Sequence, residues 1–117
     1  QPVFETEGDS IYQLDKPGMA WVKRSRSPDV RGASSWIGQA WFGRNAWVIK
    51  TYAEHLFSGA DYTKTYFYSR DKGRSWRPFQ LSHAQERGLL GLDQTGDALL
   101  TLAERGGKTI IQRYPLD

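Results

Sequence analysis

The sequence predicts an all-β fold made of antiparallel sheets and hairpins. Short segments rich in aromatic and β-branched residues alternate with turn sequences rich in Gly, Pro, Asp and Asn. The spacing of these turns is typical of β-sandwiches, barrels and propellers. Five Trp, six Tyr and five Phe supply large side chains for a core. A chain of 117 residues is long enough for one domain, which we expect to span residues 1–117.

Turns divide the first half of the chain into strands. The sequence DKPG is typical of a tight turn between two strands, and the polar stretch RSPDVRGASS is typical of a loop. The sequence GRN separates the two strands of the clearest hairpin. The expected strands of this half are 10–14, 19–25, 36–42 and 46–52.

The strand expected at 46–52 has large apolar groups on both faces. Trp47, Ile49 and Thr51 fall on one face of this strand. Val48, Lys50 and Tyr52 fall on the other. A strand with this composition is typically central in its sheet and covered on both sides.

The second half begins with a loop expected at 53–62 and continues with a hairpin and a three-stranded meander. Segment 82–88 fits a turn or a short helix. Segment 97–104 also fits a helix with Asp97 as its N-cap, but DQTG and RGGK are tight-turn sequences one strand apart, which favours a strand. The expected strands of this half are 63–69, 75–81, 89–92, 97–104 and 109–114.

The turn SRDKGRSW, residues 69–76, carries polar groups at fixed spacing and ends in a tryptophan. Gly73 allows a positive φ, and Asp71 can accept backbone N–H groups within the turn. The hydroxyls of Ser69 and Ser75 can link its two arms, while burial of Trp76 against the sheet contributes about 2 kcal/mol.

These five residues match S-x-D-x-G-x-[ST]-W, so the turn resembles the Asp-box, or BNR repeat, of bacterial sialidases and other β-propellers. The resemblance implies a truncated, propeller-like arrangement of two to three blade-like sheets. It also implies a structural role for the turn residues, because the Asp-box of that family lies away from the catalytic face. LDKPGMAW, residues 14–21, and LDQTGDAL, residues 92–99, are weaker matches.

No recognisable catalytic constellation accompanies this turn. The arginine triad, Tyr–Glu pair and acid of sialidases have no counterpart with distinctive spacing, so we expect no enzymatic activity. A small ribonuclease is the enzymatic alternative, with His55, His83, Glu54, Glu86 and Arg87 as available groups. The absence of cysteine excludes disulfides, and we expect neither a metal nor a cofactor.

The long polar loop favours a protein-binding module. In HLFSGADY, Leu56 and Phe57 could anchor a partner, and Ser58 and Gly59 are small enough to enter a narrow cleft. Asp61 and Tyr62 complete the expected partner-binding set. In size, β-content and this loop, the chain resembles periplasmic immunity proteins that block cell-wall amidases delivered by type VI secretion. The alternatives are an ordinary connecting loop, or a carbohydrate-binding domain using Trp36, Trp41 or Tyr62.

The net charge, the apolar runs and the first residue of the sequence allow expectations about binding partners and cellular location. A net charge of +3 is mildly basic, but the aromatic residues follow strand patterns typical of a core, which makes nucleic acid an unlikely partner. No apolar run approaches the ~20 residues that a membrane helix needs, so no membrane partner is expected. The first residue, Gln1, fits a processed N-terminus, which predicts a periplasmic or secreted protein. The resemblance to immunity proteins implies that its partner is a secreted bacterial hydrolase.

Overall fold

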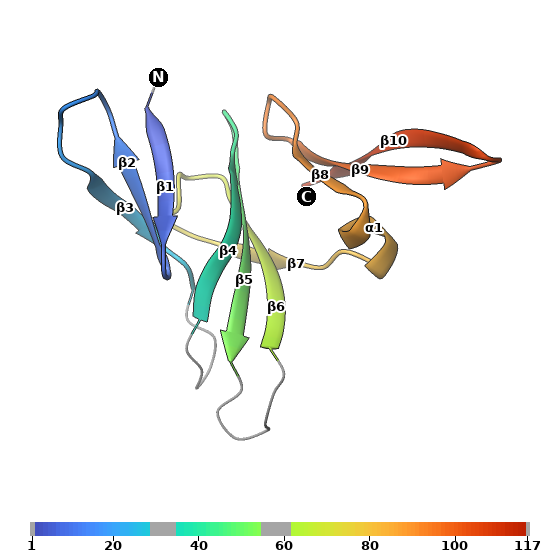
Figure 1. The fold of residues 1–117 in the computed structure, drawn as a ribbon, viewed down its shortest axis with the longest axis horizontal. Coiled ribbons are helices and arrows are strands. Elements are labelled where there is room, and N and C mark those ends of the chain that lie inside the picture. The colour runs from blue at the N-terminus through green and yellow to red at the C-terminus, as the bar shows by residue number, and fades with distance from the viewer. Residues whose placement is uncertain (1, 29–34, 55–61, 117) are drawn as a thin grey trace.

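The computed structural model describes residues 2–28, 35–54 and 62–116, and these form three antiparallel sheets and one short helix (Figure 1). The all-β prediction is therefore confirmed. The N-terminal sheet contains β1 (Val3–Glu7), β2 (Ser10–Leu14) and β3 (Val22–Arg26). The central sheet contains β4 (Ser35–Phe42), β5 (Trp47–Glu54), β6 (Tyr62–Ser69) and β7 (Arg77–Phe79). The C-terminal sheet contains β8 (Leu89–Leu92), β9 (Ala98–Arg105) and β10 (Lys108–Pro115), and α1 (His83–Arg87) precedes it.

Strand β1 was not expected from the sequence. It pairs with β2 over all five of its residues, from Val3 opposite Leu14 to Glu7 opposite Ser10. Phe4 points inward, where its ring stacks on that of Phe42 at 4.7 Å. Only one large apolar residue of β1 is buried in this way, so the alternation in its sequence is too weak to predict a strand.

Three predicted boundaries were wrong. The third strand begins at Val22, not at residue 19, because the connection after β2 runs from 15 to 21 before pairing resumes. The strand expected at 75–81 is shortened to Arg77–Phe79, because Trp76 leaves the ladder to pack beneath the turn. The loop expected at 53–62 is shorter, because Glu54 pairs with Tyr62.

The central position of β5 is confirmed. The order of its sheet is β4-β5-β6-β7, and the two faces of β5 contribute to two different cores. Trp47 and Ile49 pack with Ile11 of the N-terminal sheet. On the opposite face, Val48 packs with Leu99 of the C-terminal sheet. The three sheets therefore lie in series, with the central sheet covered on both faces near its upper end in Figure 1.

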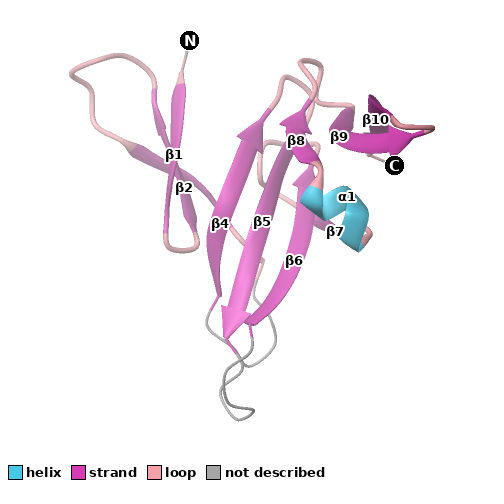
Figure 2. Ribbon diagram, turned by 45° about the vertical axis from the view of Figure 1, so that its right-hand side comes forward, coloured by secondary structure: helices cyan, strands magenta, loops and turns pink. Residues whose placement is uncertain are grey.

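Segment 98–105 is a strand, so the helical alternative for this segment was wrong. Its partner β10 runs back beside it without a break in register. The residues expected to form a turn or a short helix, 82–88, contain α1, which Figure 2 shows between the central and C-terminal sheets. A capping box fixes its start, because Ser82 and Gln85 each accept the other's backbone N–H.

Candidate functional site

Three aromatic side chains meet at the lower end of the central sheet, which extends beyond the other two sheets (Figures 1 and 2). We call Trp36, Tyr52 and Tyr62 the aromatic end. Trp36 of β4 lies directly opposite Tyr52 of β5, and their rings stack with centroids 5.8 Å apart. Tyr62 of β6 meets the Trp36 ring edge-on at 5.4 Å. Tyr62 is 58% exposed, so the group offers apolar surface to a partner.

A glycine makes room for this group. The register of β4 against β5 shifts between Ile37 and Gln39, so Gly38 lies in an irregularity of the ladder. A Cβ atom at Gly38 would lie 2.2 Å from Cε2 of Tyr52, because the tyrosine ring lies over the glycine. The ring of Tyr52 is thus held between the Gly38 backbone and Trp36, which fixes the orientation of the aromatic end.

A charged network lies beside the aromatic end on the same face of the sheet. The Glu86 carboxylate of α1 accepts hydrogen bonds from Lys64 Nζ at 2.9 Å and from the Tyr66 hydroxyl at 2.8 Å. Lys50 Nζ lies 3.6 Å from the same carboxylate and 5.4 Å from the centre of the Tyr52 ring. We call Lys50, Lys64, Tyr66 and Glu86 the Glu86 network.

Hydrogen bonds in the Glu86 network favour the ionised carboxylate of Glu86 and the neutral hydroxyl of Tyr66. The hydrogen bond from Lys64 lowers the pKa of Glu86, against the opposing effect of burial, and the bond from Tyr66 lowers it further. Burial raises the pKa of Tyr66, and its bond to Glu86 raises it more. A carboxylate with three donors around it is a poor proton acceptor, so this network fits a rigid support for the sheet face better than an acid–base pair.

The turn at 69–76 is held together by its own side chains. The Asp71 carboxylate accepts hydrogen bonds from the Ser69 hydroxyl at 2.7 Å, the Ser75 hydroxyl at 2.6 Å and the Ser75 backbone N–H at 2.9 Å. The two serine hydroxyls and the backbone N–H lower the pKa of Asp71 from 3.8 to about 2. Gly73 has a φ of 86°, as the sequence predicts. Although Asp71 is exposed, its oxygens are occupied within the turn.

The same turn also joins two sheets. The Ser25 hydroxyl of β3 donates a hydrogen bond of 2.7 Å to the Gly73 carbonyl. The Trp76 ring packs against the core between the N-terminal and central sheets, and its Nε1–H donates to the Arg26 carbonyl at 3.1 Å. The turn therefore attaches the central sheet to the N-terminal sheet.

The turn at 93–96 makes a similar attachment on the other side. Asp93 Oδ1 accepts hydrogen bonds from the backbone N–H groups of Gly96 at 2.8 Å and Asp97 at 3.1 Å. The Thr95 carbonyl accepts from the Asn45 N–H at 2.9 Å. The C-terminal sheet is thereby fixed to the β4–β5 hairpin of the central sheet.

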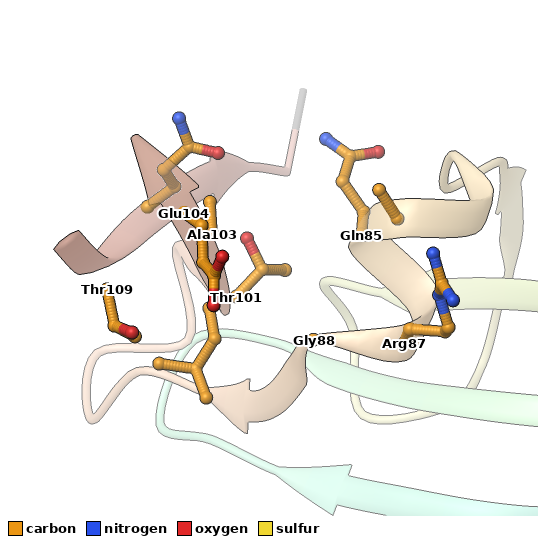
Figure 3. Close-up of a pocket in the computed structure, with 10 residues that line it drawn as sticks. Gln85, Arg87, Gly88, Thr101, Ala103, Glu104 and Thr109 are labelled. Atoms are coloured by element: carbon orange, nitrogen blue, oxygen red, sulfur yellow. The ribbon is translucent and has the colours of Figure 1, made fainter. Parts of the chain in front are cut away.

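A groove of about 470 Å³ lies between α1 and the C-terminal sheet. Figure 3 shows Gln85 and Arg87 on the helix side and Thr101, Glu104 and Thr109 on the sheet side. Its polar groups do not converge on a common point, and the Gln85 side chain is already used to cap α1. We therefore place the candidate site at the aromatic end rather than in this groove.

The expected partner-binding residues fall mostly outside the described residues. Leu56, Phe57, Ser58, Gly59 and Asp61 lie there, as does His55 of the ribonuclease alternative. Tyr62 is described, and the structure brings it together with Trp36. Trp41 does not join them, because it packs against the core between the central and C-terminal sheets. The role of Tyr52 was missed, although its place opposite Trp36 follows once the hairpin register is known.

Within residues 2–28, 35–54 and 62–116, no cluster of three or more His, Asp or Glu side chains could hold a metal ion. No helix in the described part of the chain is long and apolar enough to cross a membrane. Comparisons of the chain with protein-family models, curated proteins and solved structures found no match.

Proposed function

We propose that the protein is a non-enzymatic binding module that contacts a protein partner through the aromatic end. The observation that carries this proposal is the packing of Trp36, Tyr52 and Tyr62 into one group that stays partly exposed beyond the neighbouring sheets. Tyrosine and tryptophan are enriched among the residues that dominate protein–protein binding energy. Because the three rings already hold one another in place, binding would order few side chains.

The proposed partner is a secreted bacterial hydrolase that degrades the cell wall, and the proposed effect is inhibition in the periplasm or outside the cell. Two observations support this finer proposal. The strands β5 and β6 that carry Tyr52 and Tyr62 are joined by HLFSGAD, residues 55–61, whose Leu, Phe, Ser and Gly suit insertion into a cleft. The three sheets, with an Asp-box-like turn, support the likeness to a truncated β-propeller used as a rigid scaffold.

The experiment is a titration of purified secreted peptidoglycan amidases with the protein, with cell-wall hydrolysis followed by turbidity. Stoichiometric loss of amidase activity is the expected result. Replacing Ser58 with Arg should weaken inhibition at least ~100-fold, because a bulky side chain clashes in a narrow cleft. A 100-fold loss corresponds to about 2.8 kcal/mol of binding free energy, at 1.4 kcal/mol for each factor of ten. Inhibition that survives both Ser58→Arg and Tyr62→Ala would remove this end of the molecule from the interface.

Carbohydrate binding is the second candidate, and the exposure of Tyr62 beside Trp36 favours it. A sugar ring packs on an exposed aromatic face, and Glu54, directly opposite Tyr62 in the ladder, could accept its hydroxyl groups. Calorimetric titration with cell-wall oligosaccharides distinguishes the two candidates. Saturable heat that disappears in Tyr62→Ala would favour the carbohydrate over the protein partner.

A further inference from the structure

Strand β10 is the longest regular edge strand among the described residues. It pairs with β9 on one side over eight residues without a break in register, and it is the outermost strand of its sheet. In Figure 1 the β9–β10 hairpin projects to the right of the other two sheets. The outer edge of β10 therefore presents backbone N–H and C=O groups that no strand of the described residues pairs.

The other edge strands of the three sheets carry features that discourage pairing with another chain. The ladders of β3, β4 and β8 contain register shifts, β7 has three residues including Pro78, and β1 has five. Short length, irregularity and proline are the usual ways in which proteins protect sheet edges. In β10, proline occurs only at the last position, Pro115.

The exposed face of the C-terminal sheet is apolar next to this edge. Ile111 of β10 lies directly opposite Leu102 of β9, and the two are 62% and 42% exposed. Leu90 of β8 is 50% exposed. Leu90 lies in a bulge of β8, where the register against β9 shifts between Leu89 and Gly91. Leu102 and Ile111 thus place two exposed aliphatic side chains next to the unpaired edge.

We propose that a second copy of this chain pairs with β10 in antiparallel orientation, so that the two C-terminal sheets become one six-stranded sheet. The register places Ile111 of one copy opposite Ile111 of the other. The exposed aliphatic side chains then continue across the junction as Leu102, Ile111 and the same two residues of the second copy. The two copies are related by a twofold axis, as in most homodimers.

The placement of charges favours this register over the registers two residues away on either side. With Ile111 opposite Ile111, Arg113 lies opposite Thr109 of the second copy, and Thr109 is itself opposite Glu104 in the β9–β10 ladder. Arg113 of one copy and Glu104 of the other are then two strand spacings apart, about 10 Å, with only a small threonine between them. Their side chains are long enough to meet over it. A twofold axis between antiparallel strands allows slips of two residues at a time, and such a slip places Arg113 opposite Gly107 or Ile111, out of the row of Glu104.

Both partners of this contact are accessible. Arg113 forms an exposed ion pair with Asp93 at 3.2 Å, and an exposed arginine can exchange such a partner at little cost. Glu104 is exposed and has no ion pair among the described residues. Within one chain, Glu104 and Arg113 lie in different rows of the β9–β10 ladder, because Glu104 is opposite Thr109 and Arg113 is opposite Leu100. The ion pair between them therefore forms only between copies.

The test is sedimentation equilibrium of the full chain over a range of concentrations. The wild-type protein should dimerise reversibly, and Ile111→Lys should raise the dimer dissociation constant at least about tenfold, because two lysines would then face each other. Val3→Lys is the matched control, since Val3 is an exposed aliphatic residue on the edge strand β1. This control should leave the dissociation constant unchanged.

A charge exchange tests the register and keeps the proposal falsifiable if Ile111→Lys does not fold. Arg113→Glu and Glu104→Arg should each weaken the dimer, and the double variant should restore it to within about threefold of wild type. The proposal is overturned if the wild-type protein is monomeric at every concentration, whether or not β10 then pairs with an extended peptide. It is also overturned if the double variant fails to recover the dimer.

Discussion

At the scale of single residues, the structure ties the conformation of the turn at 69–76 to the charge of one carboxylate. The Asp71 carboxylate acts as the acceptor in all three of its hydrogen bonds, so the turn stabilises the ionised form of this carboxylate. The chemistry of this turn could be foreseen from the spacing of its residues, because all its internal contacts are local. Its attachment to Ser25 could not, because that contact joins residues 48 positions apart.

The ionisation of Asp71 makes the stability of the protein depend on pH. Its pKa falls from 3.8 to about 2 on folding, so the ionised turn stabilises the protein fully above the unfolded pKa. This contribution is lost as the pH falls from about 4 to about 2. The difference in melting temperature between wild type and Asp71→Asn should therefore shrink over that range. A constant difference for Asp71→Asn from pH 2 to pH 7 would contradict the prediction.

The exposed ring of Tyr62 should dominate binding at the aromatic end. Tyr62→Ala should weaken binding of the protein partner about 30-fold, which corresponds to the ~2 kcal/mol of a binding hot spot. The melting temperature should change little, because the side chain is mostly exposed. Trp21→Ala removes a half-exposed aromatic side chain next to the N-terminal sheet and should leave affinity unchanged. Equal losses for the two variants would indicate a non-specific aromatic effect.

At the scale of elements, the sequence predicts most strands because their apolar residues alternate or fill both faces. The clearest cases are 36–42, 63–69 and 89–92, which match β4, β6 and β8 closely. Strand β1 escapes prediction because its pairing with β2, and not its own pattern, defines it. The aromatic end depends on register across three strands, so Trp36 and Tyr62 could be named as candidates from the sequence, but the part of Tyr52 and the assembly of the three rings could not.

The helix α1 should depend on the Glu86 network for its attachment to the central sheet. Lys50 is only 14% exposed, so removing the carboxylate leaves an amine with little water around it. Glu86→Ala should lower the free energy of unfolding by about 1–3 kcal/mol. Chemical denaturation measures this change, with Glu7→Ala on the exposed face of β1 as the control. A loss below ~0.5 kcal/mol, typical of surface substitutions, would show that α1 is held by other contacts.

At the scale of the whole molecule, the three sheets form an open series. The radius of gyration is 15.6 Å, against about 13 Å for a compact chain of this length. The central sheet has a core on each side, whereas each outer sheet has one. The turns in the sequence indicate where strands end, but the grouping of strands into sheets and the order of packing follow from which strands pair and which side chains point to which face.

Attachment between sheets can be measured with two glycines of nearly equal conformation. Gly73 and Gly18 have φ values of 86° and 87°. A Cβ at Gly73 would lie 2.3 Å from Ser25 Oγ, whereas a Cβ at Gly18 would have nothing within 4 Å. Alanine therefore adds the same backbone strain at both sites but a clash only at Gly73. Gly73→Ala should destabilise the protein by about 1–3 kcal/mol more than Gly18→Ala in denaturant titrations. Equal effects would mean that the turn can move away from β3 freely.

The serial packing of the sheets has a consequence for local opening. An outer sheet can detach by exposing a single interface, but the central sheet can open only after both of its neighbours have separated from it. Amide hydrogens of β5 should therefore exchange with solvent most slowly, at the rate set by global unfolding. Those of β1 should exchange earlier through partial opening, and so should those of β10 in the monomer. The protein would then unfold inward from both ends of the series, and its slowest-exchanging core would be one strand, from Trp47 to Glu54.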